Sequence, residues 1–210
     1  MSRLLLLFCV LLAGCAGYRY GEVSHAYVEP APAVATVVRG RQNWLEVPGA
    51  RVRVELSNEV QHSEHQVMLF IVPVMYDPID KPLYQAGQGA RLLLEISPLA
   101  GAASFRPEQV ALSIDGHEHR PAGVQQQVVF DPGRYPLEGA RDAEERAPGG
   151  LDYALQRAER HYQFWLRFDA PMPAPSQDIR LDLSRALRVP GQPPVPLIRF
   201  RPVPWKQGYT

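Results

Sequence analysis

The sequence predicts an all-β protein, folded as a two-layer antiparallel β-sandwich of about eight strands. Three observations lead to this class. Several short segments alternate apolar and polar residues, which is typical of strands with one buried face. Proline accounts for 21 of the 210 residues, and each internal proline would break a long helix. Asp115-Gly116 is a strong signal for a two-residue hairpin.

One domain is predicted, over residues 49–210. A chain of 210 residues with 46% hydrophobic content can bury one full core. Residues 67–72 are the most apolar run, and they predict a central strand that ends or bulges at Pro73. Strict alternation marks strands at 51–56, 109–114 and 178–184, and looser alternation marks others at 66–76, 91–97, 124–130, 162–169 and 195–202.

One long insertion interrupts the strand pattern at 136–160. The segment is polar and charged, and Leu151, Leu155, Ala158 and Tyr162 then recur at helical spacing. We expect it to carry one short helix between two strands. Long insertions in compact domains are usually functional or disordered, and the composition favours neither.

The N-terminal segment has the layout of a secretory signal peptide. Arg3 supplies a positive charge, and Leu4 to Leu12 is an unbroken apolar run. The run is too short to span a membrane, which takes about 20 apolar residues, and it suits a signal-peptide core. Leu12-Ala13-Gly14-Cys15 then matches the lipobox, and in this segment the chain resembles bacterial lipoproteins. The alternatives are an ordinary signal peptide cut a few residues later and an N-terminal helix.

The lipoprotein resemblance implies an anchor and a compartment. It implies cleavage between Gly14 and Cys15, which removes residues 1–14. It also implies a diacylglyceryl group on the Cys15 thiol and an acyl chain, such as palmitate, on the new amino group. Ala16 follows the cysteine, and a neutral residue there implies transfer to the outer membrane in Gram-negative bacteria. We therefore expect a lipid-anchored protein of the cell envelope that faces the periplasm.

Residues 15–48 are predicted to form the lipidated N-terminus and a flexible tether. The apolar periodicity is weak there, and Pro30 and Pro32 lie among small residues. A flexible segment of about 30 residues reaches roughly 30 Å, enough to hold a domain clear of the lipid headgroups. Residues 34–38 are an alternative candidate for a first strand.

Residues 105–116 resemble the immunoglobulin-like modules of some bacterial lipoproteins. The likeness lies in Phe105-Arg-Pro and in the alternating residues up to Asp115-Gly116. It implies an immunoglobulin-like sandwich and carries no activity with it. The Cys…Trp…Cys core of true immunoglobulin domains is absent, so the likeness is one of architecture.

Composition and motifs exclude several function classes. Cleavage would leave Cys15 as the only cysteine, and its modification excludes disulfides, thiol catalysis and a cysteine-based metal site. The formal net charge is zero, so bulk charge gives no sign of nucleic-acid binding. No nucleophile elbow, zinc-protease helix or phosphate-binding glycine loop occurs. No cofactor is predicted, and we do not expect an enzyme.

Two histidines are the candidate metal ligands. His117 and His119 follow the Asp115-Gly116 turn, and residues two apart on a strand share one face. With a distant carboxylate they could hold zinc or copper. The alternative is that both are solvated histidines beside a turn.

Two tryptophans are the candidate contacts with a partner. On the predicted strand 162–169, Trp165 points away from the apolar face, beside Arg167. Tryptophan and arginine dominate binding hot spots, although the insertion or the C-terminal tail could instead fold over Trp165. In the tail, two prolines are expected to prevent a regular ladder beyond Phe200. Trp205 would then either face a partner or help to cover an edge strand.

The expected function is that of a non-enzymatic binding or scaffold module, anchored to the membrane by lipid and contacting another envelope protein. The alternative is a metal- or small-ligand-binding envelope protein that uses His117 and His119. An envelope hydrolase with a dispersed catalytic site is the least expected of the three.

Overall fold

The computed structural model describes residues 16–30, 37–38, 43–67, 73–84, 89–99, 102–130 and 144–209. It confirms an all-β, sandwich-like fold built from antiparallel sheets. The one helix among these residues is a single 3-10 turn, η1 (Pro107–Gln109). In the same part of the chain, no helix is long and apolar enough to cross a membrane.

The largest sheet holds both ends of the described chain. Its strand β16 pairs with β1 along eleven residue pairs, from Gly17–Tyr209 to Tyr27–Arg199. In spatial order the sheet contains β10 (His117–His119), β9 (Ala111–Ile114), β14 (Ile179–Asp182), β16 (Ile198–Tyr209), β1 (Ala16–Tyr27), β5 (Val60–Val67) and β6 (Pro73–Pro82), and β2 (Val37–Val38) pairs with β16.

Two smaller sheets complete the body. The five-stranded sheet runs in the order β11 (Pro121–Phe130), β13 (His161–Phe168), β7 (Ala90–Pro98), β4 (Ala50–Leu56) and β3 (Leu45–Val47). The third sheet joins β12 (Tyr153–Leu155), β8 (Ala103–Phe105) and β15 (Leu187–Arg188). Several of these strands have only two or three residues, too few to show alternation, which explains why only about eight strands were predicted from sequence.

The core lies between the sheets and follows the predicted alternation. On β13, Tyr162, Phe164, Leu166 and Phe168 are buried while the residues between them are partly exposed. The Phe164 ring also packs against Phe105, with centroids 4.6 Å apart. Burying each such side chain stabilises the fold by about 1.5–3 kcal/mol. The predicted hairpin at Asp115-Gly116 is confirmed, because it joins β9 to β10 and both residues have positive φ.

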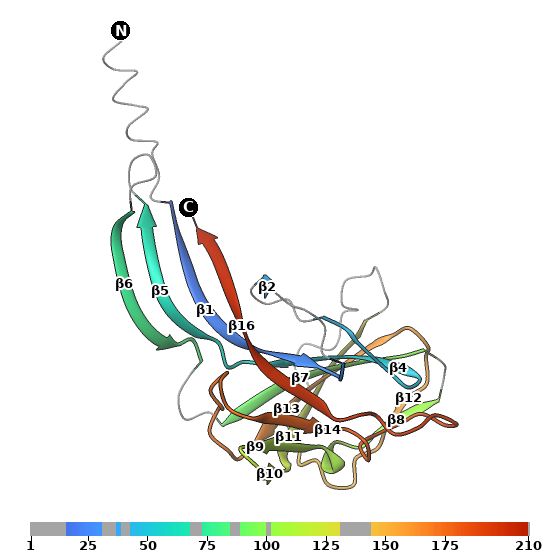
Figure 1. The fold of residues 1–210 in the computed structure, drawn as a ribbon. Coiled ribbons are helices and arrows are strands. Elements are labelled where there is room, and N and C mark those ends of the chain that lie inside the picture. The colour runs from blue at the N-terminus through green and yellow to red at the C-terminus, as the bar shows by residue number, and fades with distance from the viewer. Residues whose placement is uncertain are drawn as a thin grey trace.

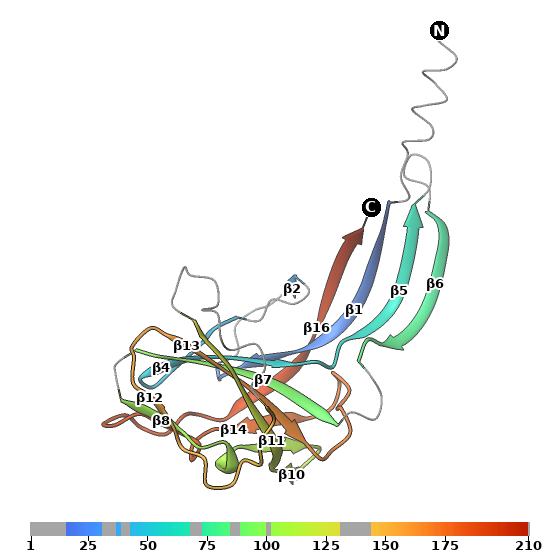
Figure 2. The same ribbon diagram turned by 180° about the vertical axis from the view of Figure 1, so that it is seen from behind.

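Four strands extend beyond the body as a curved arm. In Figures 1 and 2, parts of β1, β5, β6 and β16 rise from the sandwich as one curved layer, with the start of β1 and the end of β16 at the far end. We call this feature the arm. The groove described below lies in the body.

The predicted tether is wrong for Ala16–Tyr27, which form β1 between β16 and β5. The weak apolar pattern was misleading because β1 buries polar residues, and one of them, Ser24, is hydrogen-bonded to the buried Asn58. Asn58 donates its side-chain amide to Ser24 Oγ at 2.8 Å, and Ser24 N donates to Asn58 Oδ1 at 3.2 Å. The rest of the predicted tether includes β2 and β3, while residues 31–36 and 39–42 lie outside the described residues.

The single strand predicted at 66–76 is also wrong. β5 ends at Val67 and β6 begins at Pro73, and the two strands pair antiparallel with Val67 opposite Pro73. The chain therefore reverses between them. Residues 68–72 lie outside the described residues.

The short helix predicted in the insertion is wrong over 144–160. There the chain forms β12, which pairs with β8, and Leu155 is fully buried. Tyr153 packs its ring 5.0 Å from that of Phe164, so tertiary contacts overrode the helical spacing. Residues 136–143 of the insertion lie outside the described residues.

The ladder that prolines were expected to interrupt continues to Tyr209. Pro202 lies opposite Ser24, whose N–H turns away from β16 to the Asn58 side chain. This is a non-hydrogen-bonded pair, so no donor is needed from Pro202. Pro204, two residues on, has the same orientation, and both nitrogens face the side of β16 that lies away from β1.

Candidate functional site: a groove at Trp165

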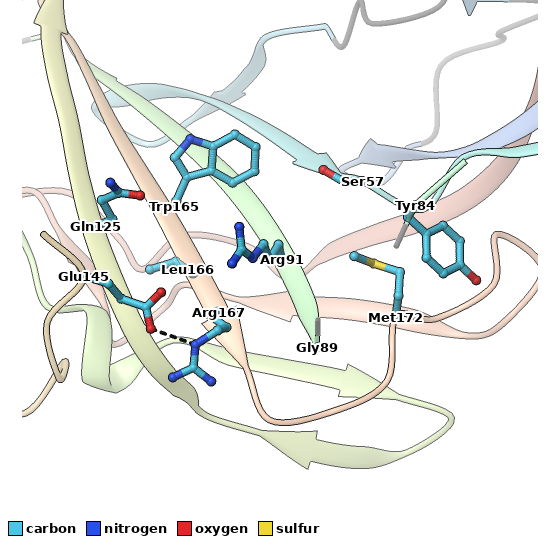
Figure 3. A pocket seen from close by; sticks show the side chains of 10 residues that line it. All are labelled: Ser57, Tyr84, Gly89, Arg91, Gln125, Glu145, Trp165, Leu166, Arg167 and Met172. Atoms are coloured by element: carbon cyan, nitrogen blue, oxygen red, sulfur yellow. Dashed lines mark hydrogen bonds and ion pairs between the residues drawn. The ribbon is translucent and has the colours of Figure 1, made fainter. Parts of the chain in front are cut away.

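A groove of about 490 Å³ lies along β13, over the outer face of the five-stranded sheet. Trp165 and Arg167 of β13 line it together with Arg91 of β7 (Figure 3). Tyr84 and Met172 come from connections between strands, and Glu145 comes from the insertion. The volume is in the range of known ligand pockets.

Sheet register brings the two arginines together. Arg167 lies directly opposite Arg91 of β7, and Trp165 lies opposite Leu93 of β7 and Gln125 of β11. Residues directly opposite on neighbouring strands point to the same face. The alternation that buries Phe164 and Leu166 therefore sends Trp165 and Arg167 into the groove.

The two arginines differ in their partners. Arg167 Nε donates to Glu145 Oε1 at 2.7 Å, and its guanidinium also pairs with Asp169. Hydrogen bonding to Glu145 raises the pKa of Arg167. Arg91 is exposed, and it forms no ion pair with any carboxylate of the described residues. In the described part of the chain, the groove therefore holds one neutralised guanidinium and one without a counter-charge.

A glycine allows Glu145 to reach Arg167. A Cβ on Gly123, the residue of β11 opposite Arg167, would lie 2.1 Å from Glu145 Oε1. The neighbouring residue Arg146 is fixed to Val124 of β11 by two backbone hydrogen bonds of 2.8 and 2.9 Å. The described end of the insertion thus lines the groove, while Trp165 remains partly exposed.

A second charged cluster on the same face is internally paired. Glu95 of β7 is buried, and its Oε1 accepts hydrogen bonds of 2.5 Å from both Arg53 and Gln163. The Arg53 guanidinium also lies 5.2 Å from the centre of the Trp44 ring. Arg53 therefore already has a carboxylate partner, which Arg91 lacks within the described ranges.

The other predicted partner contact is in a different place. Trp205 is fully buried in the arm, where it lies opposite Gly21 of β1. A Cβ on Gly21 would lie 2.5 Å from the Trp205 ring, so the absence of a side chain makes room for the indole. The prediction that Trp205 contacts a partner is therefore wrong, because its side chain is fully buried.

The predicted metal ligands lie on the edge strand β10, away from the groove. His117 is exposed and His119 partly exposed, and Glu118 between them pairs with Arg120 at 2.5 Å. Within the described ranges, no three His, Cys, Asp or Glu side chains are grouped as metal ligands. The lipidation and cleavage residues, Cys15 and Gly14, lie outside the described residues.

The groove residues suit recognition of a partner better than acyl transfer. Among its described lining residues, Ser57 is a hydroxyl nucleophile, but no histidine is present to act as its base. An indole, a phenol, a thioether and an unneutralised guanidinium instead offer apolar contact beside a positive charge. Trp165 and Arg167 were predicted from the sequence as contact residues, whereas Arg91 was not. The alternation of residues over 91–97 was a signal that could have placed Arg91 on the outer face.

Comparison of the chain with models of known protein families, with curated proteins and with solved structures gives no match in any of the three.

Proposed function

We propose that the protein is a lipid-anchored lipoprotein of the bacterial cell envelope and acts as a non-enzymatic binding module. Lipid on Cys15 holds it to the outer membrane of a Gram-negative cell, facing the periplasm. The groove at Trp165 then contacts an acidic segment of another envelope protein. The lipobox Leu12-Ala13-Gly14-Cys15 supports the anchor.

We infer the binding role from the environment of Arg91. Its guanidinium is exposed in a groove, beside a partly exposed Trp165 and opposite a second arginine, with no carboxylate partner among the described residues. A carboxylate from a partner would form a charge-assisted hydrogen bond there. Trp165 and Tyr84 would pack against the apolar part of the same segment.

Crosslinking in native membranes tests this proposal. The full-length protein, its Trp165→Ala variant and its Leu197→Ala variant are each crosslinked, solubilised and recovered. Leu197 is exposed in the body and does not line the groove, so it controls for loss of apolar surface. We expect one partner band to be lost with Trp165→Ala and retained with Leu197→Ala. Identical partner profiles for all three proteins would reject the groove as the binding surface.

A separate experiment tests the anchor. Cells are grown with an alkyne fatty acid, and the protein is tested for incorporation of the label. We expect label on the wild type, and no label on a Cys15→Ser variant. A Cys15→Ser variant that still carries label and sediments with membranes would contradict the proposed anchor.

A further inference from the structure

The end of the arm begins immediately after the proposed lipidation site. β1 starts at Ala16, which pairs with Val67 of β5 at the arm's far end. Cys15 is the preceding residue, and consecutive Cα atoms are about 3.8 Å apart. An anchor on Cys15 would therefore be joined directly to a paired strand, with no flexible tether between them.

Aromatic and basic side chains gather on one face of this end. Tyr18 and Tyr20 lie on β1, opposite His65 of β5 and Lys206 of β16, respectively. We call these four residues the Tyr18 cluster. The Tyr18 ring stacks on His65 with centroids 4.6 Å apart, and Tyr20 meets Tyr18 edge-on at 5.1 Å. Lys206 Nζ lies 4.5 Å from the Tyr18 centroid and 5.2 Å from that of Tyr20.

This chemistry is that of a membrane interface. Tyrosine places an apolar ring near the acyl chains and a hydroxyl among the headgroups, and it is enriched at that depth. Lysine can pack its methylene stem on the rings while its ammonium reaches lipid phosphate. On the other face of β1, Arg19 forms an ion pair with Glu64 at 3.2 Å. That face therefore presents two charges that neutralise each other.

The edges of the arm are poorly suited to contact with another strand. The outer strand β6 contains Pro78, and the side of β16 that faces away from β1 carries Pro202 and Pro204 and is already paired with β2 at Trp205 and Lys206. Proline lacks the N–H that strand addition needs and is a common means of blocking sheet edges. The Tyr18 cluster is therefore the better contact surface of the arm.

From this juxtaposition we infer that the arm is a second binding surface, and that the Tyr18 cluster rests on the headgroups of the lipid bilayer. The inference depends on the proposed lipidation of Cys15, which places the bilayer at this end. Residues 17–22 span roughly 20 Å at the rise of a strand. The arm would thus hold the body, with its groove, away from the membrane surface.

Spin labelling of the lipidated full-length protein tests the inference. Gly208→Cys places the label beside Lys206, on the same face, where an added Cβ would meet its nearest neighbour at 3.8 Å. Gln192→Cys places a control label on an exposed turn of the body. With Cys9 cleaved off and Cys15 acylated, the introduced cysteine would be the one free thiol.

The labelled proteins are reconstituted in vesicles of equal parts phosphatidylethanolamine and phosphatidylglycerol. Collision rates with a water-soluble nickel chelate and with oxygen are then compared between vesicles and detergent-free buffer containing no lipid. We expect label 208 to become several-fold less accessible to nickel on vesicles, with label 192 unchanged. Adding Lys206→Gln removes one basic charge and should weaken the shielding of label 208 by about fivefold on an anionic surface.

The possible outcomes distinguish failure of the arm inference from failure of the proposed anchor. If the protein floats with the vesicles but label 208 is as accessible to nickel as label 192, the arm inference is overturned while the anchor stands. If the wild-type protein carries no lipid and does not float, the proposed anchor fails first. Shielding that persists undiminished in Lys206→Gln would exclude the lysine from the contact.

Discussion

Arg91 and Arg167 lie directly opposite each other on β7 and β13, but among the residues that the structure describes only Arg167 has carboxylate partners. Like charges in directly opposed positions destabilise a sheet. Glu145 and Asp169 neutralise one of the two guanidinium groups and leave the other exposed to solvent. This exposed guanidinium is the group that we propose to bind a carboxylate of the partner, and its position opposite Arg167 has a small cost to the stability of the free protein.

Replacing Arg91 should separate binding from folding. In Arg91→Gln we expect recovery of the crosslinked partner to fall, because the charge that pairs with it is gone. The free energy of unfolding should change by no more than about 0.5 kcal/mol, as for other exposed substitutions. Crosslinking yield and urea denaturation measure the two effects. Arg185→Gln removes an exposed arginine outside the groove and should leave both unchanged.

Gly123 and Glu145 should act on stability as a coupled pair. Gly123→Ala would push the Glu145 carboxylate away from Arg167, since the added Cβ would lie 2.1 Å from Oε1. The lost partly exposed ion pair should cost about 0.2–1 kcal/mol. In a Glu145→Ala background the same substitution should cost less. Urea denaturation of the single and double variants measures the coupling, and strictly additive costs would count against this contact.

The sequence pattern predicted only some of the residues that line this groove. Strict alternation over residues 162–169 is sufficient to predict that Trp165 and Arg167 point outward from β13. The pairing of Arg167 with Arg91 depends on the register between β7 and β13, which alternation alone leaves open. The contribution of Glu145 depends on a bridge between Val124 and Arg146, for which the polar insertion gives no sequence signal.

The absence of a side chain at Gly21 should be essential to the packing of the arm. Gly21→Ala would place a Cβ 2.0 Å from the Val60 backbone oxygen and 2.5 Å from the Trp205 ring, and backbone cannot move aside cheaply. We expect a loss of about 2 kcal/mol or more in unfolding free energy. Gly208→Ala is the matched control, with its nearest neighbour at 3.8 Å, and should cost little. Equal stability of the two variants would contradict this packing.

Much of the arm was not predicted from the sequence. Its strand β1 contains glycines and buries Ser24 and His25, so it lacks the alternation that marked β4 and β14. Its partner β16 contains two prolines, which are tolerated because their nitrogens face away from β1. Trp205 was misplaced for the same reason, since its burial requires Gly21 directly opposite on β1.

Acid should destabilise the fold through His25. This side chain is 1% exposed and lies opposite Arg201. Burial lowers the pKa of His25, and the nearby Arg201 lowers it further. The unfolded chain, with an ordinary histidine pKa of about 6.5, then binds a proton that the folded protein does not. The stabilisation is complete above that pH and is lost as pH falls through the folded-state pKa.

Comparison with a His25→Gln variant isolates this effect. The other histidines remain in both proteins, including His62, whose pKa is raised by its hydrogen bond to Asp80 and which acts in the opposite sense. Unfolding free energies are measured by urea denaturation across the acid range. We expect the wild type to lose more stability than the variant below about pH 6.5. Parallel profiles would show that His25 does not titrate on unfolding.

The mass of the mature N-terminus shows whether the protein is anchored by lipid at Cys15. The protein is purified from native membranes, digested, and its N-terminal peptide analysed by mass spectrometry. We expect a chain that begins at Cys15 and carries a diacylglyceryl group and an N-linked acyl chain. An unmodified Cys15, or a first residue beyond it, would contradict the anchor and remove the reason to place the arm at a membrane.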